Sequence, residues 1–339
     1  MKNTSLIFLF ASLLILAACS QPGKKVTALS PFIQCIFQDK QHNYWFGSDR
    51  DGLYKYDGKS LMQYTEADGL PHPQIRTIQQ DINGNVWIVT GYGICYYNGT
   101  EFIPFVDDEQ RRDSLKVTKW PISDNDIYLQ AGSGVYCFNG KNFGYWSIVA
   151  PANLNFIKGG GLMSNTTVYC TLRSKKQKLY VGTQAIGVVV CDAKSMEYIS
   201  TDSSSKLVVR CILEDKKGNI WYGTNGGGLM IFDGKQLRNI TKELKLDDSD
   251  TIHNLELKPN LKRIWSIAED EQSNIWIGSN ESGLWKYDGN NIIHFGDKEG
   301  INSQSIHCIY KDQTNKLWLG TSNGTYTFDG TKFELFRIP

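Results

Sequence analysis

Short apolar segments of about five residues recur along the chain, and turns containing glycine and aspartate separate them. The stretch 208–240 is a clear copy: apolar runs at Val208–Leu213, Asn219–Gly223, Gly228–Phe232 and Gln236–Ile240 have the length and flanking turns typical of strands. Asp233 precedes a glycine between the last two runs, which favours a tight hairpin. We therefore predict four antiparallel strands, named a to d in chain order.

This pattern repeats about every 41 residues. Each copy has an aromatic residue in strand b, a glycine that opens strand c, and a turn residue five positions later. The aromatic anchors are Trp45, Trp87, Tyr128, Tyr180, Trp221, Trp276 and Trp318. Four-stranded repeats of this length are typical of β-propellers, in which blades close into a ring. The sequence thus predicts an all-β, seven-bladed β-propeller of four-stranded antiparallel blades over residues 32–339.

Two intervals between anchors are longer than the others and contain insertions. We place them at Ala150–Gly161 and Lys242–Lys262, each between strand d of one blade and strand a of the next. In a four-stranded meander these connections share one face with the b–c turns, here called the b–c/d–a face. Long loops on one face of a rigid scaffold often carry function.

The N-terminal segment has the features of an export signal. Lys2 precedes the apolar run Leu6–Ala18, which is too short to span a bilayer. The run ends in Leu16-Ala17-Ala18-Cys19, which resembles a bacterial lipobox; the alternative is an ordinary secretory signal. We predict a signal peptide at 1–18, a lipidated tether at 19–31 with lipid on Cys19, and no swapped strand in Val26–Ser30. Lipid would hold the domain on the cell envelope, and Ser20 favours an outer membrane position facing the periplasm.

Four of the eight cysteines share one position, ten residues before an anchor: Cys35, Cys170, Cys211 and Cys308. Thr77 and Ser266 occupy it in other copies, so strand a needs a small side chain there. In the third copy Thr118 occupies it if the shorter turn of that copy is not compensated upstream. Buried free cysteine meets this need. A structural disulfide and a metal or redox site are the alternatives.

The charge balance and the missing motifs narrow the function. The chain has 36 basic and 35 acidic residues, which argues against nucleic-acid binding. It lacks phosphate-loop, serine-hydrolase and zinc-protease motifs, and its five histidines show no metal-ligand spacing. We predict neither a cofactor nor a metal.

The candidate ligand-binding residues lie where the repeats differ. One position before the small slot the chain has Gln34, Arg76, Tyr169, Arg210, Trp265 and His307; the b–c turns add Arg50, Tyr92, Asn225 and Glu281. Tyr92 and Trp265 would suit stacking on a sugar ring, with arginine or Glu281 as orienting partners. The alternative is that these side chains only pack between blades or are solvated turns.

Val208–Gly234 resembles the two-component regulator propeller repeat, and Gly69–Ile75 resembles its lead-in. The resemblance covers about residues 32–336 and is weakest in the third and fourth copies. It implies a sensor-type periplasmic propeller, a class linked to carbohydrate sensing. The chain departs from that plan because it has one set of seven blades and neither a kinase nor a DNA-binding domain.

We therefore predict a non-catalytic, lipid-anchored propeller that binds a small molecule, a glycan or an envelope protein on its b–c/d–a face. One alternative is a metal-dependent enzyme resembling streptogramin lyase, using His72 or His307 with Glu281. The other is a scaffold subunit of an envelope complex.

Overall fold

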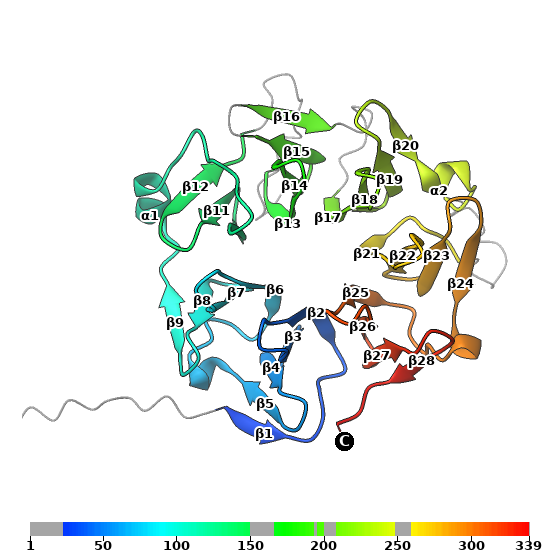
Figure 1. Ribbon diagram of the computed structural model, residues 1–339, viewed down its shortest axis with the longest axis horizontal. Helices are drawn as coiled ribbons and strands as arrows, with labels where there is room; N and C mark the ends of the chain where they lie inside the picture. The colour runs from blue at the N-terminus through cyan, green and yellow to red at the C-terminus, as the bar shows by residue number, and fades with distance from the viewer. Residues whose placement is uncertain (1–22, 150–165, 193–194, 200–207, 248–258, 339) are drawn as a thin grey trace, which may run out of the picture.

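The computed structural model describes residues 23–149, 166–192, 195–199, 208–247 and 259–338. These residues form seven antiparallel sheets arranged as blades of a ring (Figure 1). The predicted seven-bladed β-propeller is confirmed. The signal peptide, Cys19 and the insertion at 150–161 lie outside the described residues, as does the middle of the second insertion.

The strands of each blade follow one another outward from the inner strand of the ring. Blades 1 and 2 contain β2 (Ile33–Gln38), β3 (Tyr44–Ser48), β4 (Leu53–Tyr56), β5 (Leu61–Tyr64), β6 (Ile75–Gln80), β7 (Val86–Thr90), β8 (Ile94–Tyr97) and β9 (Phe102–Phe105). Blades 3 and 4 contain β10 (Ile127–Ala131), β11 (Gly134–Phe138), β12 (Phe143–Ser147), β13 (Val168–Arg173), β14 (Leu179–Thr183), β15 (Val188–Cys191) and β16 (Met196–Ile199).

The remaining blades repeat the same order. Blade 5 contains β17 (Val208–Glu214), β18 (Ile220–Asn225), β19 (Gly228–Phe232) and β20 (Leu237–Asn239), and blade 6 contains β21 (Ile264–Glu269), β22 (Ile275–Ser279), β23 (Leu284–Tyr287) and β24 (Ile292–Phe295). Blade 7 contains β25 (Ile306–Lys311), β26 (Leu317–Thr321), β27 (Thr325–Phe328) and β28 (Phe333–Leu335). Short helices α1 (Glu109–Ser114), α2 (Ile240–Glu243), η1 (Glu66–Asp68) and η2 (Asp297–Glu299) lie between strands.

A hydrogen bond between tryptophan and aspartate is repeated in five blades. In blade 5 the indole Nε1 of Trp221 donates to Asp215 Oδ2 over 2.9 Å, and the same carboxylate accepts from the backbone and side-chain nitrogens of Asn219. The equivalent pairs are Asp39–Trp45, Asp81–Trp87, Asp270–Trp276 and Asp312–Trp318. The a–b turn is thereby fixed to strand b of its own blade, because the acceptor and the buried indole satisfy each other.

Neighbouring blades approach each other most closely at the glycine of strand b. A Cβ on Gly47 would lie 2.4 Å from Cys35 Sγ and 2.6 Å from Ile75 Cγ2 of the next blade. Gly182, Gly223, Gly278 and Gly320 are enclosed in the same way by the small-slot residue and an aliphatic residue of the next blade. The predicted small slot therefore exists because of this contact. The cysteines in the described part of the chain are free thiols.

Blade 3 departs from the prediction, because the described residues before β10 form no inner strand. Residues 115–117 instead pair with the outer strand: Val117 N donates to Tyr145 O over 3.0 Å, and Tyr145 N donates to Leu115 O over 2.7 Å. Thr118 is thus not in a strand, and its expected slot is wrong. The amide of Gln79, from blade 2, donates to Tyr128 O and accepts from Tyr128 N, which replaces part of the missing strand's hydrogen bonding.

The ring closes between blades 7 and 1 through the contacts used elsewhere. Gly324 N donates to Pro31 O over 2.9 Å, as Gly52 N does to Pro73 O and Gly228 N to Lys262 O. Tyr44 Oη also donates to Asp312 Oδ2 over 2.7 Å. Each of these glycines has a positive φ, which glycine adopts at little cost.

The N-terminal residues of the described chain are attached to the outside of blade 1. Strand β1 (Lys24–Val26), assigned to the tether in the sequence prediction, pairs with β5 as a fifth strand (Figure 1). At the other end of the chain, β28 forms the outer strand of blade 7. No strand is exchanged between blades 1 and 7 within the described residues.

We expect Asp215→Ala to lower the free energy of unfolding by about 3 kcal/mol, because it leaves the buried Trp221 indole and the Asn219 amide without an acceptor. Asp233→Ala is the matched control. Asp233 accepts two backbone hydrogen bonds in an exposed c–d turn of the same blade, so its loss should be clearly smaller. Urea unfolding of both variants measures the difference, and equal losses would contradict the structural role of the tryptophan–aspartate pair.

We expect the thiols of the native protein to react slowly with a disulfide reagent at pH 8. Burial raises the pKa of Cys95, Cys191 and Cys308 to about 12, and the thiolate is the reactive form. The chain has eight cysteines, one of them Cys19. After unfolding, a lipidated protein should titrate seven thiols, whereas a count of five or fewer would indicate a disulfide.

Candidate functional site

A β-bulge recurs at the start of strand a, and it contains the inner-strand residues that differ between blades. The pairing of strands a and b shifts between Ile33 and Cys35, and equivalent shifts occur in blades 2, 4, 5, 6 and 7. The bulged residues are Gln34, Arg76, Tyr169, Arg210, Trp265 and His307. A bulge leaves one residue outside the ladder and redirects its side chain. The residues on either side pack against neighbouring blades, so only the bulged residue is released from packing.

Four of the bulged side chains form a continuous arc across blades 4 to 7. The guanidinium carbon of Arg210 lies 4.5 Å from the ring centre of Tyr169 and 5.3 Å from that of Trp265. The rings of Trp265 and His307 follow at 5.1 Å, and His307 Nε2 lies 2.9 Å from Ser322 Oγ. The four side chains are half-buried. The structure thus brings together Tyr169, Arg210, Trp265 and His307, which are far apart in the sequence.

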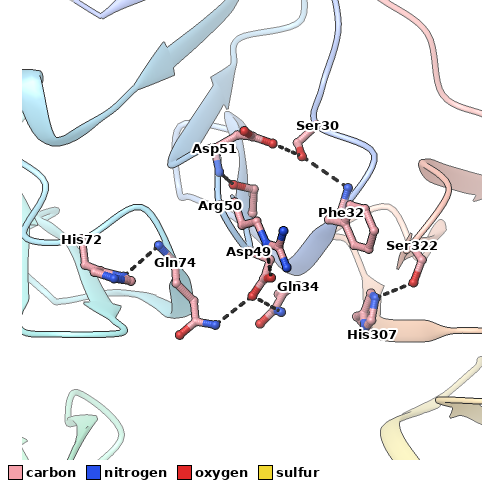
Figure 2. A network of polar contacts seen from close by, with 11 residues as sticks. Ser30, Phe32, Gln34, Asp49, Arg50, Asp51, His72, Gln74, His307 and Ser322 are labelled. Atoms are coloured by element: carbon pink, nitrogen blue, oxygen red, sulfur yellow. Dashed lines mark hydrogen bonds and ion pairs between the residues drawn. The ribbon is translucent and has the colours of Figure 1, made fainter.

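The adjoining part of the ring, in blades 1 and 2, has an acidic centre at Asp49. Its Oδ1 accepts from the side-chain amides of Gln34 and Gln74, both over 2.7 Å (Figure 2). Arg76 Nη2 reaches Gln74 Oε1 at 3.5 Å, but the Arg76 side chain is otherwise exposed. Gln34 and Arg76 therefore belong to this amide–carboxylate cluster and not to the aromatic arc. Sequence reasoning missed Gln74, because it lies in the lead-in Gly69–Ile75, outside the bulge and b–c turn positions from which the candidates were chosen.

The b–c turn candidates do not converge on the arc. Arg50 is exposed and lies 3.4 Å from its neighbour Asp49, and Tyr92 is 79% exposed with its ring edge against His72. Asn225 extends strand β18 and pairs with Val208 and Arg263 through its backbone. Glu281 forms an ion pair with Arg263 on the surface. A residue can therefore lie in a b–c turn on the b–c/d–a face without reaching the arc.

A groove of about 820 Å³ lies on the b–c/d–a face between blades 6 and 7. The loop before β25 and the b–c turns of both blades line it, with Glu281, His294, Asp297 and Asn323 among the polar side chains. His294 Nε2 lies 2.9 Å from Ser282 O, and Asn323 Nδ2 donates to Asn302 O. Ser322 lines the groove and also contacts His307, so the groove reaches the end of the arc.

The three residues considered for lyase chemistry have separate partners. His72 Nδ1 accepts from Gln74 N over 3.1 Å, His307 lies against Trp265 and Ser322, and Glu281 is paired with Arg263. The described residues contain no group of three or more histidine, cysteine or acidic side chains placed to share a metal ion.

None of the helices in the described ranges is long and apolar enough to cross a bilayer.

We compared the sequence of this chain with models of known protein families. Five segments, residues 28–50, 69–92, 203–226, 259–281 and 300–323, match the family model described as "Two component regulator propeller". Five repeats of the chain are therefore of the two component regulator propeller type. The matched segments include the bulges and b–c turns of blades 1, 2, 5, 6 and 7. A comparison with curated proteins gives no match.

Solved structures share the fold at low sequence identity. The extracellular domain of BT4673 from B. thetaiotaomicron, described as a hybrid two component system, is 22% identical with a TM-score of 0.61; the match covers 89% of this chain and 39% of that one. Virginiamycin B lyase from Staphylococcus aureus is 12% identical with a TM-score of 0.62, covering 92% and 99% of the two chains. YCF48 from Cyanidioschyzon merolae is 12% identical with a TM-score of 0.59, covering 90% and 97%. The chain thus spans about two fifths of the first of these structures.

The pKa of His307 predicts a pH dependence of stability. Burial lowers this pKa in the folded protein, and the nearby Asp49 acts in the opposite direction to a smaller extent. An unfolded histidine takes up a proton near pH 6.5, so acidification below that value favours the unfolded chain. We expect the free energy of unfolding to fall less between pH 7.5 and 5.5 in His307→Gln than in the unaltered protein. Urea unfolding at three pH values tests this, and an unchanged slope would contradict it.

Proposed function

We propose that this protein is a non-catalytic, sensor-like propeller that binds a ligand at the arc of Tyr169, Arg210, Trp265 and His307. The observation that carries the proposal is the bulge series: the scaffold fixes the residues around each bulge and leaves the bulged side chain free to differ. Three flat side chains and a guanidinium that stack around the inside of a rigid ring form a preorganised surface. The groove between blades 6 and 7 would extend this surface toward the b–c/d–a face.

The family supports a role in sensing, and the structures with this fold include an extracellular domain of a hybrid two component system. We infer that the chain acts in the cell envelope, anchored by lipid on Cys19. An outer membrane position facing the periplasm is part of this proposal, as are a contribution to signal transduction and a carbohydrate as one class of ligand.

A ligand screen on the purified protein tests the proposed site. A compound at one hundred times its dissociation constant should raise the free energy of unfolding by about 2.7 kcal/mol, which a thermal shift detects. For any compound that binds, Trp265→Ala should weaken affinity about tenfold or more, because it removes a stacking face of the arc.

Tyr92→Ala is the matched control, since it also removes an aromatic side chain that the sequence suggested as a sugar-stacking residue. Tyr92 lies on an exposed turn outside the arc, so the affinity should not change. A ligand whose binding depends on Tyr92 and not on Trp265 would place the site on the turns and overturn the proposal. Stable capture of an envelope protein by both variants would instead favour the scaffold alternative.

A further inference from the structure

The arc contains several hydrogen-bonding atoms that the protein leaves unused. Arg210 Nε, Trp265 Nε1 and His307 Nδ1 are buried and have no hydrogen-bond partner. They lie on three successive side chains of the same arc. A buried polar atom without a partner costs free energy, and most such atoms in folded proteins are paired. Three adjacent exceptions indicate that the arc is completed by something outside the chain.

The three unpaired atoms can act as hydrogen-bond donors, so the missing partner is a hydrogen-bond acceptor on a ligand. The Nε–H of Arg210 and the indole N–H of Trp265 can only donate, and His307 Nδ1 can donate in one of its tautomers. Because His307 Nε2 faces the Ser322 hydroxyl, which accepts as readily as it donates, the donor tautomer at Nδ1 is available. The ligand group must therefore offer several lone pairs within a small volume.

The charges around the arc favour a negatively charged ligand. Arg112, Arg173, Arg238 and Arg263 each form an ion pair with a carboxylate, whereas Arg210 has none among the described residues. Asp49, the acidic residue that acts on His307, already accepts from Gln34 and Gln74 and contacts Arg50. Arg76 adds a second positive charge that acts on Arg210 across the ring. A half-buried guanidinium without a counter-ion is a strong site for a carboxylate, which it can bind through two parallel hydrogen bonds.

We propose that the arc binds the carboxylate of a small organic acid, with Arg210 as its counter-ion and Trp265 and His307 as further donors. This inference rests on the proposed function, because it names the ligand chemistry of the same site. A monoanion fits better than a phosphate dianion, since the three donors of the arc carry only the single positive charge of Arg210, and Arg76 is exposed and lies outside the arc. The negative charge of Asp49, which is felt at His307, further disfavours a dianion.

The test uses acid and neutral compounds of matched shape on the purified protein. Glucuronate with glucose, and benzoate with benzamide, separate a sugar acid from an aromatic acid, and inorganic sulfate tests for general anion binding. Ligand-observed NMR titration measures the affinities. We expect at least one acid to bind about tenfold or more tightly than its neutral partner. Raising the sodium chloride concentration should weaken the acid and leave the neutral compound unchanged.

Variants locate the charge that causes the preference. Arg210→Gln should abolish the preference for the acid, and Arg210→Lys should retain part of it, because the charge remains but the two-pronged geometry is lost. Trp265→Phe keeps a ring but removes the donor, so it should reduce the preference by a smaller factor. Arg238→Gln is the matched control, because Arg238 is exposed on an outer strand and paired with Glu243; it should leave all affinities unchanged.

The outcomes separate this inference from the proposed function. Equal binding of acid and neutral partners that is lost in Trp265→Ala would leave the site intact and overturn the carboxylate inference. Sulfate binding as tightly as the better acid would overturn it as well. If no probe or screened compound depends on Trp265 or Arg210, the proposed binding site itself is wrong. The salt titration needs no variant, so the inference can still fail if a substitution prevents folding.

Discussion

The structure depends on the close approach of neighbouring blades at the glycine of each strand b. At Gly47 the small Cys35 side chain of the same blade and Ile75 of the next blade occupy the space that a Cβ would need. An isolated blade could not bury this aliphatic residue, so the blades stabilise one another in sequence, as in other repeat proteins. Gly320 meets Cys308 and Ile33 in the same way, and the contact therefore also closes the ring between the last blade and the first.

The same constraint creates the candidate site. The slot residue must be small and the residue two positions earlier must be aliphatic, because both face the tightest contact between blades. The residue between them is placed in a bulge and is released from that packing. Six blades repeat the bulge, and blade 3 lacks it because its preceding segment pairs with the outer strand. Variable side chains are thereby held at fixed positions around a rigid ring.

The two sides of the ring differ in how completely their polar groups are satisfied. Around Asp49, amide donors and a carboxylate acceptor pair with each other, so this side is complete without a ligand (Figure 2). On the arc, aromatic rings cover the Arg210 guanidinium, and its buried Nε has no hydrogen-bond partner. Stacking on a ring face is favourable for arginine but leaves its in-plane hydrogen bonds open. This asymmetry distinguishes a structural polar cluster from a surface suited to binding.

The sequence by itself determined the fold class, the number of blades, the strand-b anchors and the small slot, because each depends on a local pattern that repeats in register. It also identified all six bulged residues, since they vary where their neighbours do not. Only the tertiary structure decided which of them meet: Tyr169, Arg210, Trp265 and His307 form one arc, whereas Arg76 and the turn residue Tyr92 lie apart from it. The missing inner strand of blade 3 and the pairing of β1 with β5 were likewise not predictable. These features depend on contacts between segments distant in the chain, and a repeat pattern specifies the position of a residue within its blade but not the neighbours that ring closure gives it.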